Sequence, residues 1–103
     1  RYVIHTVGPI YRGGAHGEAD ILAGAYRESL KLASANRLKS LSFPAISAGV
    51  YGYPLQEAAR IALTTVLDYL AAHRDIELVR FVLFGQETFD AFSAVLRDLI
   101  PSY

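Results

Sequence analysis

Strand-like and helix-like segments alternate three times along the chain, and each strand-like segment leads into a helix. β-Branched and aromatic side chains mark the first kind, and apolar stripes at helical spacing mark the second. The strand-like segments are residues 2–7, 41–46 and 78–84, and the helix-like segments are residues 18–35, 54–70 and 87–100. This alternation predicts an α/β fold with a largely parallel sheet. The last strand-like segment is nearly apolar throughout, as expected when both faces of a strand are covered.

Two prolines mark the middle strand–helix unit. Pro44 interrupts the strand-like segment, and because proline has no N–H to donate, we expect an irregular strand there. Pro54 suits the first turn of the next helix, where the missing N–H costs little. The apolar stripe of the preceding helix comprises Ile21, Leu22, Ala25, Tyr26, Ser29, Leu30 and Ala33. Asn36 is expected to end that helix.

Composition excludes several classes of function. The chain has 103 residues, 52% of them hydrophobic, which is enough for one small domain with a single core. Its 10 basic and 10 acidic residues cancel, so no net charge recruits nucleic acid or a membrane. No apolar run approaches the roughly 20 residues that span a bilayer, and we expect a cytoplasmic protein. Cysteine is absent and His16 and His73 lack paired spacing, so we expect no metal and no cofactor.

The start of the sequence is unusual. Arg1 leads at once into the strand-like segment 2–7, and methionine is absent from the chain. An initiator methionine is normally trimmed only before a small residue, and arginine is not small. We therefore expect this sequence to be a piece of a longer chain.

Residues 47–53, Ser-Ala-Gly-Val-Tyr-Gly-Tyr, join the middle strand to the following helix. Parallel α/β sheets bind ligands beyond the carboxyl ends of their strands, where this segment is expected to lie. Gly49 and Gly52 let backbone N–H groups approach a ligand, and the helix N-terminus attracts anions. The composition fits a phosphate or diphosphate site in which Tyr51 covers a sugar or base. An ordinary tight turn with its tyrosines packed in the core fits the same composition equally well.

Other polar residues have simpler explanations. His5 lies within an apolar strand, where a hydrogen-bonded core histidine is expected rather than a general base. Glu18 and Asp20 flank a helix start, where acidic side chains interact favourably with the helix dipole. The paired glycines that follow Arg12 predict a mobile loop, from which this arginine could touch a ligand.

One long string carries a family resemblance. FPAISAGVYGYPLQEAARIAL, at residues 43–63, and the upstream strings YVIHTVGPIYRGG and GEADILAGAYRESLKLA resemble the C-terminal portion of a macrodomain of the bacterial ADP-ribosyl-hydrolase type. The resemblance covers nearly the whole chain. It implies a three-layer α/β/α fold, in which residues 1–103 form the C-terminal portion of a single macrodomain.

The resemblance also implies roles for particular residues. In the family, the second glycine-rich loop wraps the diphosphate of ADP-ribose. That role falls on Ser47, Ala48, Gly49, Val50, Tyr51 and Gly52. Tyr51 matches the aromatic residue near the distal ribose, and Phe84 stands where the family tends to place a residue beside the adenine. Family members often have Thr, Ser or Cys at the position of Ala48, and a purely backbone contact survives that difference.

Several features of the family are absent from this sequence. These are the Asn-Ala-Ala-Asn segment, the glycine-rich loop with the acidic residue tied to hydrolysis, and an early Asp that reads the adenine. No catalytic residue is therefore assigned within residues 1–103. The resemblance further implies that a central strand is missing between segments 2–7 and 41–46. We expect a complete domain to need a complementing chain, a second copy of this chain or a rearrangement.

Two functions of different classes follow. The parent domain is expected to hydrolyse ADP-ribosyl linkages, by protein de-ADP-ribosylation or by O-acetyl-ADP-ribose deacetylation. The alternative is a non-catalytic reader that binds ADP-ribose or an ADP-ribosylated protein. A third outcome is that the chain alone binds nothing, because its pocket is half built.

Overall fold

The fold is a parallel α/β arrangement of three helices and two strands, within the residues that the computed structural model describes, 12–14, 16–46 and 52–100. In chain order the elements are α1 (Glu18–Ala35), β1 (Ser40–Phe43), α2 (Leu55–Ala72), β2 (Leu78–Phe81) and α3 (Gln86–Leu99). β1 and β2 pair in parallel, with Ser40 opposite Leu78 and Phe43 opposite Phe81. The predicted α/β class with a parallel sheet is confirmed. The strand predicted at residues 2–7, with His5, lies outside the described residues.

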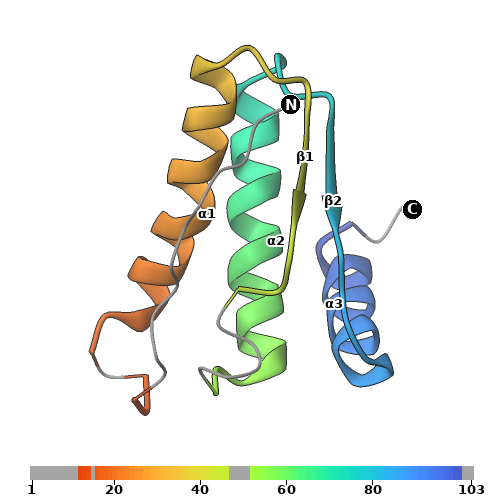
Figure 1. Ribbon diagram of the computed structural model, residues 1–103. Helices are drawn as coiled ribbons and strands as arrows, with labels where there is room; N and C mark the ends of the chain where they lie inside the picture. Colours follow the sequence, from red (N-terminus) through yellow and green to blue (C-terminus); the bar gives the residue numbers. More distant parts are fainter. Residues whose placement is uncertain (1–11, 15, 47–51, 101–103) are drawn as a thin grey trace.

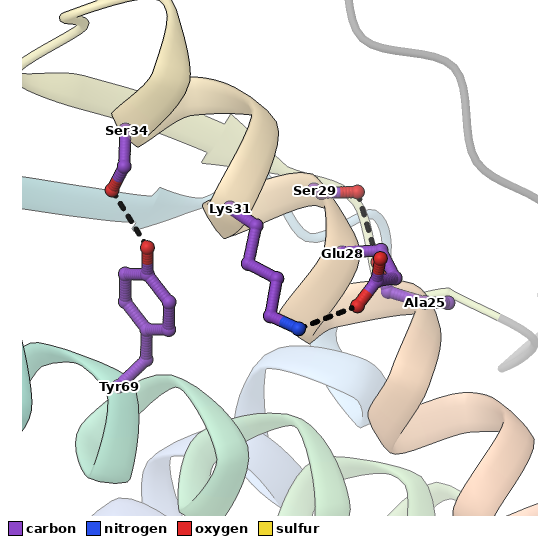
Figure 2. Close-up of polar contacts among 6 residues, drawn as sticks. All are labelled: Ala25, Glu28, Ser29, Lys31, Ser34 and Tyr69. Atoms are coloured by element: carbon purple, nitrogen blue, oxygen red, sulfur yellow. Dashed lines mark hydrogen bonds and ion pairs between the residues drawn. The ribbon is translucent and has the colours of Figure 1, made fainter.

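The three helices form one packed group. α2 packs against both α1 and α3, and Figure 1 shows α1 and α2 side by side and running in the same direction. Near their C-terminal ends the two helices are joined by the hydroxyl groups of Ser34 and Tyr69, which are 2.6 Å apart (Figure 2). The apolar stripe predicted for α1 is buried, as at Leu22 and Ala25, at every position except Ile21. Ile21 is 52% exposed, and its assignment to the stripe is wrong.

Both strands are shorter than predicted. β1 ends at Phe43, directly before Pro44, because proline cannot donate to the ladder, as expected. β2 ends at Phe81 rather than at residue 84, since the last residue of its partner β1, Phe43, lies opposite Phe81. Beyond the carboxyl ends of the strands, the N–H of Val82 still donates to the carbonyl of Phe43 at 2.7 Å, and at their other ends the N–H groups of Glu77 and Leu78 donate to the carbonyl of Lys39.

β2 is also more exposed than predicted. Exposure alternates along it, with Leu78 and Arg80 exposed and Val79 and Phe81 half-buried. The expectation that both faces of this strand are covered is therefore wrong for the structure as described. The buried face joins an aromatic cluster, in which the ring of Phe81 lies 5.4 Å from that of Phe92 in α3.

The helix ends follow local chemistry. Asn36 ends α1 as predicted, and its side-chain amide donates to the carbonyl of Leu32 at 2.8 Å. Pro54 stands directly before α2 rather than inside its first turn, and its carbonyl accepts the N–H of Ala58 at 2.9 Å. Among the described helices, none is long and apolar enough to cross a membrane.

Candidate functional site

All three helices begin at the same end of the molecule, and both strands point toward that end (Figure 1). We call this end, formed by the last residues of β1 and β2 and the first turns of α1, α2 and α3, the carboxyl edge. None of the three helices has a side-chain hydrogen bond that caps its N-terminus. The dipoles of three helices therefore point their positive ends at the carboxyl edge, where the first turns also carry acidic side chains, namely Glu18, Asp20, Glu57 and Glu87.

The predicted diphosphate loop falls mostly outside the described residues. Ser47, Ala48, Gly49, Val50 and Tyr51 lie there, and Gly52 is the one member that the structure describes. Gly52 has a φ of 72°, in the left-handed region that favours glycine. An added Cβ at Gly52 would meet no atom within 4 Å, so open space adjoins this backbone just before α2. Tyr53 is buried in the core, which agrees in part with the alternative interpretation of this segment as a turn with packed tyrosines.

A tyrosine of α1 holds the chain where it approaches that loop. The hydroxyl of Tyr26 accepts the N–H of Ile46 at 3.0 Å and donates to the carbonyl of Pro44 at 3.4 Å. Burial raises the pKa of Tyr26 to about 12, against the opposing effect of the Ile46 N–H. Sequence reasoning placed Tyr26 in the core stripe but missed the hydroxyl contacts, because their partners are 18 and 20 residues away.

A glutamate at the start of α1 holds the preceding loop. The Glu18 carboxylate accepts backbone N–H groups from Arg12 at 2.7 Å, Gly14 at 3.0 Å and His16 at 2.6 Å. The Arg12 bond is the largest of several that together lower the pKa of Glu18 to about 2, although burial acts in the opposite direction. These bonds tie the described residues of the loop to the start of α1, and the mobility of the loop stays a prediction. The predicted position of Glu18 at the helix start is confirmed, and its carboxylate accepts hydrogen bonds from the backbone of the preceding loop.

Phe84, predicted to lie beside an adenine, follows β2 at the carboxyl edge and is 83% exposed. Gly85, with a φ of 86°, separates it from α3. Phe89, in the first turn of α3, is a second exposed aromatic residue that sequence reasoning did not single out. The signal that could have placed Phe89 in the first turn of a helix is Gly85, which directly precedes α3.

The described residues contain no group of three His, Cys, Asp or Glu side chains that could hold a metal ion. Glu18 is the one buried acid of this part of the chain. Its carboxylate is occupied by three N–H donors, which makes it a poor proton acceptor. The geometry thus suits binding by backbone amides and exposed aromatic rings better than it suits acid–base chemistry.

A parallel α/β unit with free N–H groups and exposed aromatic rings at its carboxyl edge defines the class of ligand-binding α/β domains. Within that class, the family model described as Macro domain matches residues 1–62. The chain belongs to the macro domain family. The predicted family and fold are confirmed.

Curated relatives are about 50% identical to this chain over the residues that they share with it. An O-acetyl-ADP-ribose deacetylase of Klebsiella pneumoniae is 52% identical over 101 residues, which are 98% of this chain and 55% of the relative. A macro domain-containing protein of Chlorobaculum tepidum is 50% identical over 95 residues, which are 92% of this chain and 55% of the relative. The chain thus spans about half the length of the curated relatives it matches.

Solved structures show the same fold. The Oceanobacillus iheyensis macrodomain with ADP matches with a TM-score of 0.93 and 43% identity, over 100% of this chain and 54% of that one. The Trypanosoma brucei macrodomain in complex with ADP-ribose matches with a TM-score of 0.84 and 38% identity, over 93% of this chain and 40% of that one.

Proposed function

We propose that this chain supplies the diphosphate-binding part of an ADP-ribose site. The observation that carries the proposal is the place of Gly52, which ends the loop marked by the family resemblance and stands just before α2 with a φ of 72°. Open space adjoins its backbone, as it does at Gly17 before α1 and Gly85 before α3. Amides that lead into a helix N-terminus are suited to an anion such as a diphosphate. The family membership supports the same ligand, because relatives in this family have been solved with ADP and with ADP-ribose.

The residues that we propose for the diphosphate are Ser47, Ala48, Gly49, Val50, Tyr51 and Gly52, acting through their backbone N–H groups. Tyr51 and Phe84 would contact the ribose and the adenine. The 83% exposure of Phe84 at the carboxyl edge supports its proposed contact with the adenine, because covering a solvent-exposed aromatic ring with a base is energetically favourable.

For the parent domain we propose hydrolysis of ADP-ribosyl linkages, by deacetylation of O-acetyl-ADP-ribose or removal of ADP-ribose from protein. The relative named O-acetyl-ADP-ribose deacetylase supports this reaction class. An activated water would attack near the proximal ribose, positioned by residues outside this sequence and by the bound diphosphate. This chain would contribute binding and orientation.

A reader that binds ADP-ribose or an ADP-ribosylated protein without hydrolysis is the second candidate. It is supported by the sequence itself, which contains the proposed binding loop and none of the residues that the family resemblance ties to hydrolysis. Turnover of O-acetyl-ADP-ribose by a chain of the relatives' full length separates the two candidates.

Calorimetric titration of ADP-ribose into a chain of the relatives' full length tests the binding proposal, because the pocket of the 103-residue chain alone is expected to be half built. Gly49→Glu places a carboxylate among the proposed phosphate contacts, and we expect it to weaken binding by about 100-fold or more. Gly24→Glu is the matched control, because it makes the same change at a helical position of α1 where an added Cβ meets nothing within 4 Å. Equal affinities of the two variants would contradict the assignment, as would a wild-type protein that releases no heat with ADP-ribose.

A further inference from the structure

The chain loses its strand partners just before the proposed diphosphate loop. β1 ends at Phe43, and Pro44 has no N–H with which to continue the ladder. Ile46 is buried, so its backbone N–H needs a partner from elsewhere, because an unpaired polar group in the interior is costly. That partner is the hydroxyl of Tyr26, which bonds to the Ile46 N–H at 3.0 Å and the Pro44 carbonyl at 3.4 Å.

The position of that hydroxyl is itself fixed by packing. Tyr26 is 1% exposed, and Leu22 and Leu30, one helical turn to either side, are fully buried. Its ring lies 5.0 Å from the ring of Phe43 in an edge-on arrangement and 6.0 Å from that of Phe81. The hydroxyl is thus held by α1 and by both strands. A tyrosine hydroxyl keeps its proton and can donate at physiological pH even at its ordinary pKa of 10, and burial raises the pKa of Tyr26 further, to about 12.

We propose that Tyr26 is a positioning residue for the ADP-ribose site. Its hydroxyl fixes the backbone of residues 44–46 and so sets the direction in which the chain reaches residues 47–52. Tyr26 touches no ligand, since it is buried beneath the carboxyl edge, and it acts through Ile46. This inference rests on the proposed function, because the loop that it positions is the proposed diphosphate loop.

The chain offers a matched control for removal of a tyrosine hydroxyl. Tyr69 in α2 is 7% exposed, and its hydroxyl lies 2.6 Å from that of Ser34 in α1 (Figure 2). It lies about 20 Å along α2 from Leu55, at about 1.5 Å per residue, and so at the end opposite the carboxyl edge. Tyr69→Phe and Tyr26→Phe therefore remove the same atom, which makes one contact at Tyr69, near the C-terminal end of α2, and two contacts at Tyr26, in the middle of α1.

Two measurements on the wild type and both variants, each in a chain of the relatives' full length, test the inference. Amide hydrogen exchange followed by NMR should show the Ile46 N–H exchanging about tenfold faster in Tyr26→Phe and unchanged in Tyr69→Phe. Calorimetry should show the Kd for ADP-ribose raised about fivefold in Tyr26→Phe and altered less than about twofold in Tyr69→Phe. A loss of general stability alone would affect both variants alike.

Each outcome decides a separate claim. Unchanged exchange at Ile46 in Tyr26→Phe overturns the role of the hydroxyl, and an unchanged Kd overturns the positioning of the site. If the wild type does not bind ADP-ribose, the proposed function fails, and the amide chemical shifts of residues 46–52 then decide the structural part. Amide chemical shifts that differ from the wild type only within that segment in Tyr26→Phe support positioning of the loop. Amide chemical shifts unchanged from the wild type in that segment overturn the positioning.

Discussion

Glu18 shows how a single side chain can organise a loop that has no regular structure. It is 2% exposed, and its carboxylate gathers the N–H groups of Arg12, Gly14 and His16. A carboxylate is suited to this because its two oxygens accept several bonds and its charge strengthens each of them. The loop before α1 is thereby tied to the first residue of the helix.

Replacement of this carboxylate should loosen the loop. In Glu18→Gln the charge is lost and an amide N–H₂ must face at least one backbone donor, so we expect a lower midpoint of thermal unfolding at pH 7. Asp20→Asn is the control, because Asp20 is an exposed acid in the same first turn. The midpoint should fall clearly more in Glu18→Gln than in Asp20→Asn. Equal midpoints would mean that the three bonds contribute nothing specific.

The same carboxylate predicts a pH dependence of stability. Its pKa is lowered in the folded protein from 4.5 to about 2, so the folded state binds fewer protons than the unfolded state in this range. The stabilisation is complete above the unfolded pKa and is lost as the pH falls from about 4.5 toward 2. The difference in midpoint between wild type and Glu18→Gln should therefore narrow on acidification from pH 5. A constant difference would show that Glu18 does not titrate as described.

At the scale of single residues, the sequence predicts positions better than partners. Glu18 was predicted at a helix start and Tyr26 in a core stripe, and both positions are confirmed. Their hydrogen bonds were not predicted, because the partners are backbone groups that every residue type carries. The partners of Tyr26 are also far away in the chain.

At the scale of elements, α2 is the helix on which the others depend. It packs against both α1 and α3, and its buried face includes Ala58, Ala59 and Ala62, all at most 1% exposed. Alanines allow neighbouring helices to approach closely, which leaves no room for a larger side chain. The small residues of this face are therefore as necessary as the large ones.

Overpacking at this face should destabilise the fold. Ala59→Leu adds three carbons at a position that is 0% exposed, and we expect a loss of about 1–3 kcal/mol in the free energy of unfolding. Ala71→Leu makes the same change at an exposed position of α2 and should alter it by less than about 0.5 kcal/mol. Urea denaturation monitored by circular dichroism compares them. Similar midpoints for the two variants would contradict the packing described here.

The helices were predictable because their signals are local. The bounds of α1 agree with the predicted residues 18–35, since an apolar stripe and terminal residues define them within the segment itself. The strands were less predictable, because a strand ends where its partner ends. Residues 82–84 read as strand by composition, but β1 stops opposite Phe81. The candidate site was predictable only as far as the loop that the family resemblance marks.

At the scale of the whole molecule, β2 and the residues directly after it expose apolar side chains. Leu78 in β2 and Val82 and Phe84 beyond its end are 43%, 50% and 83% exposed and alternate with half-buried neighbours. The exposed Arg80 stands between Leu78 and Val82 in this stripe. Exposed apolar residues gathered on one sheet face mark a surface that a further segment or chain covers. That a complete domain needs a complementing chain, a second copy or a rearrangement stays a prediction.

We therefore expect the 103-residue chain to self-associate through this stripe. Sedimentation velocity should show species larger than the monomer below about 100 µM, because burial of exposed apolar side chains drives association in this range. Leu78→Lys combined with Val82→Lys should weaken association by about tenfold or more, since each charge would have to leave water. Ile21→Lys combined with Leu32→Lys adds the same charge at residues of α1 that are 52% and 49% exposed, and should leave association unchanged. A wild-type chain that stays monomeric, or equal effects of the two double variants, would show that the stripe does not mediate contact between copies.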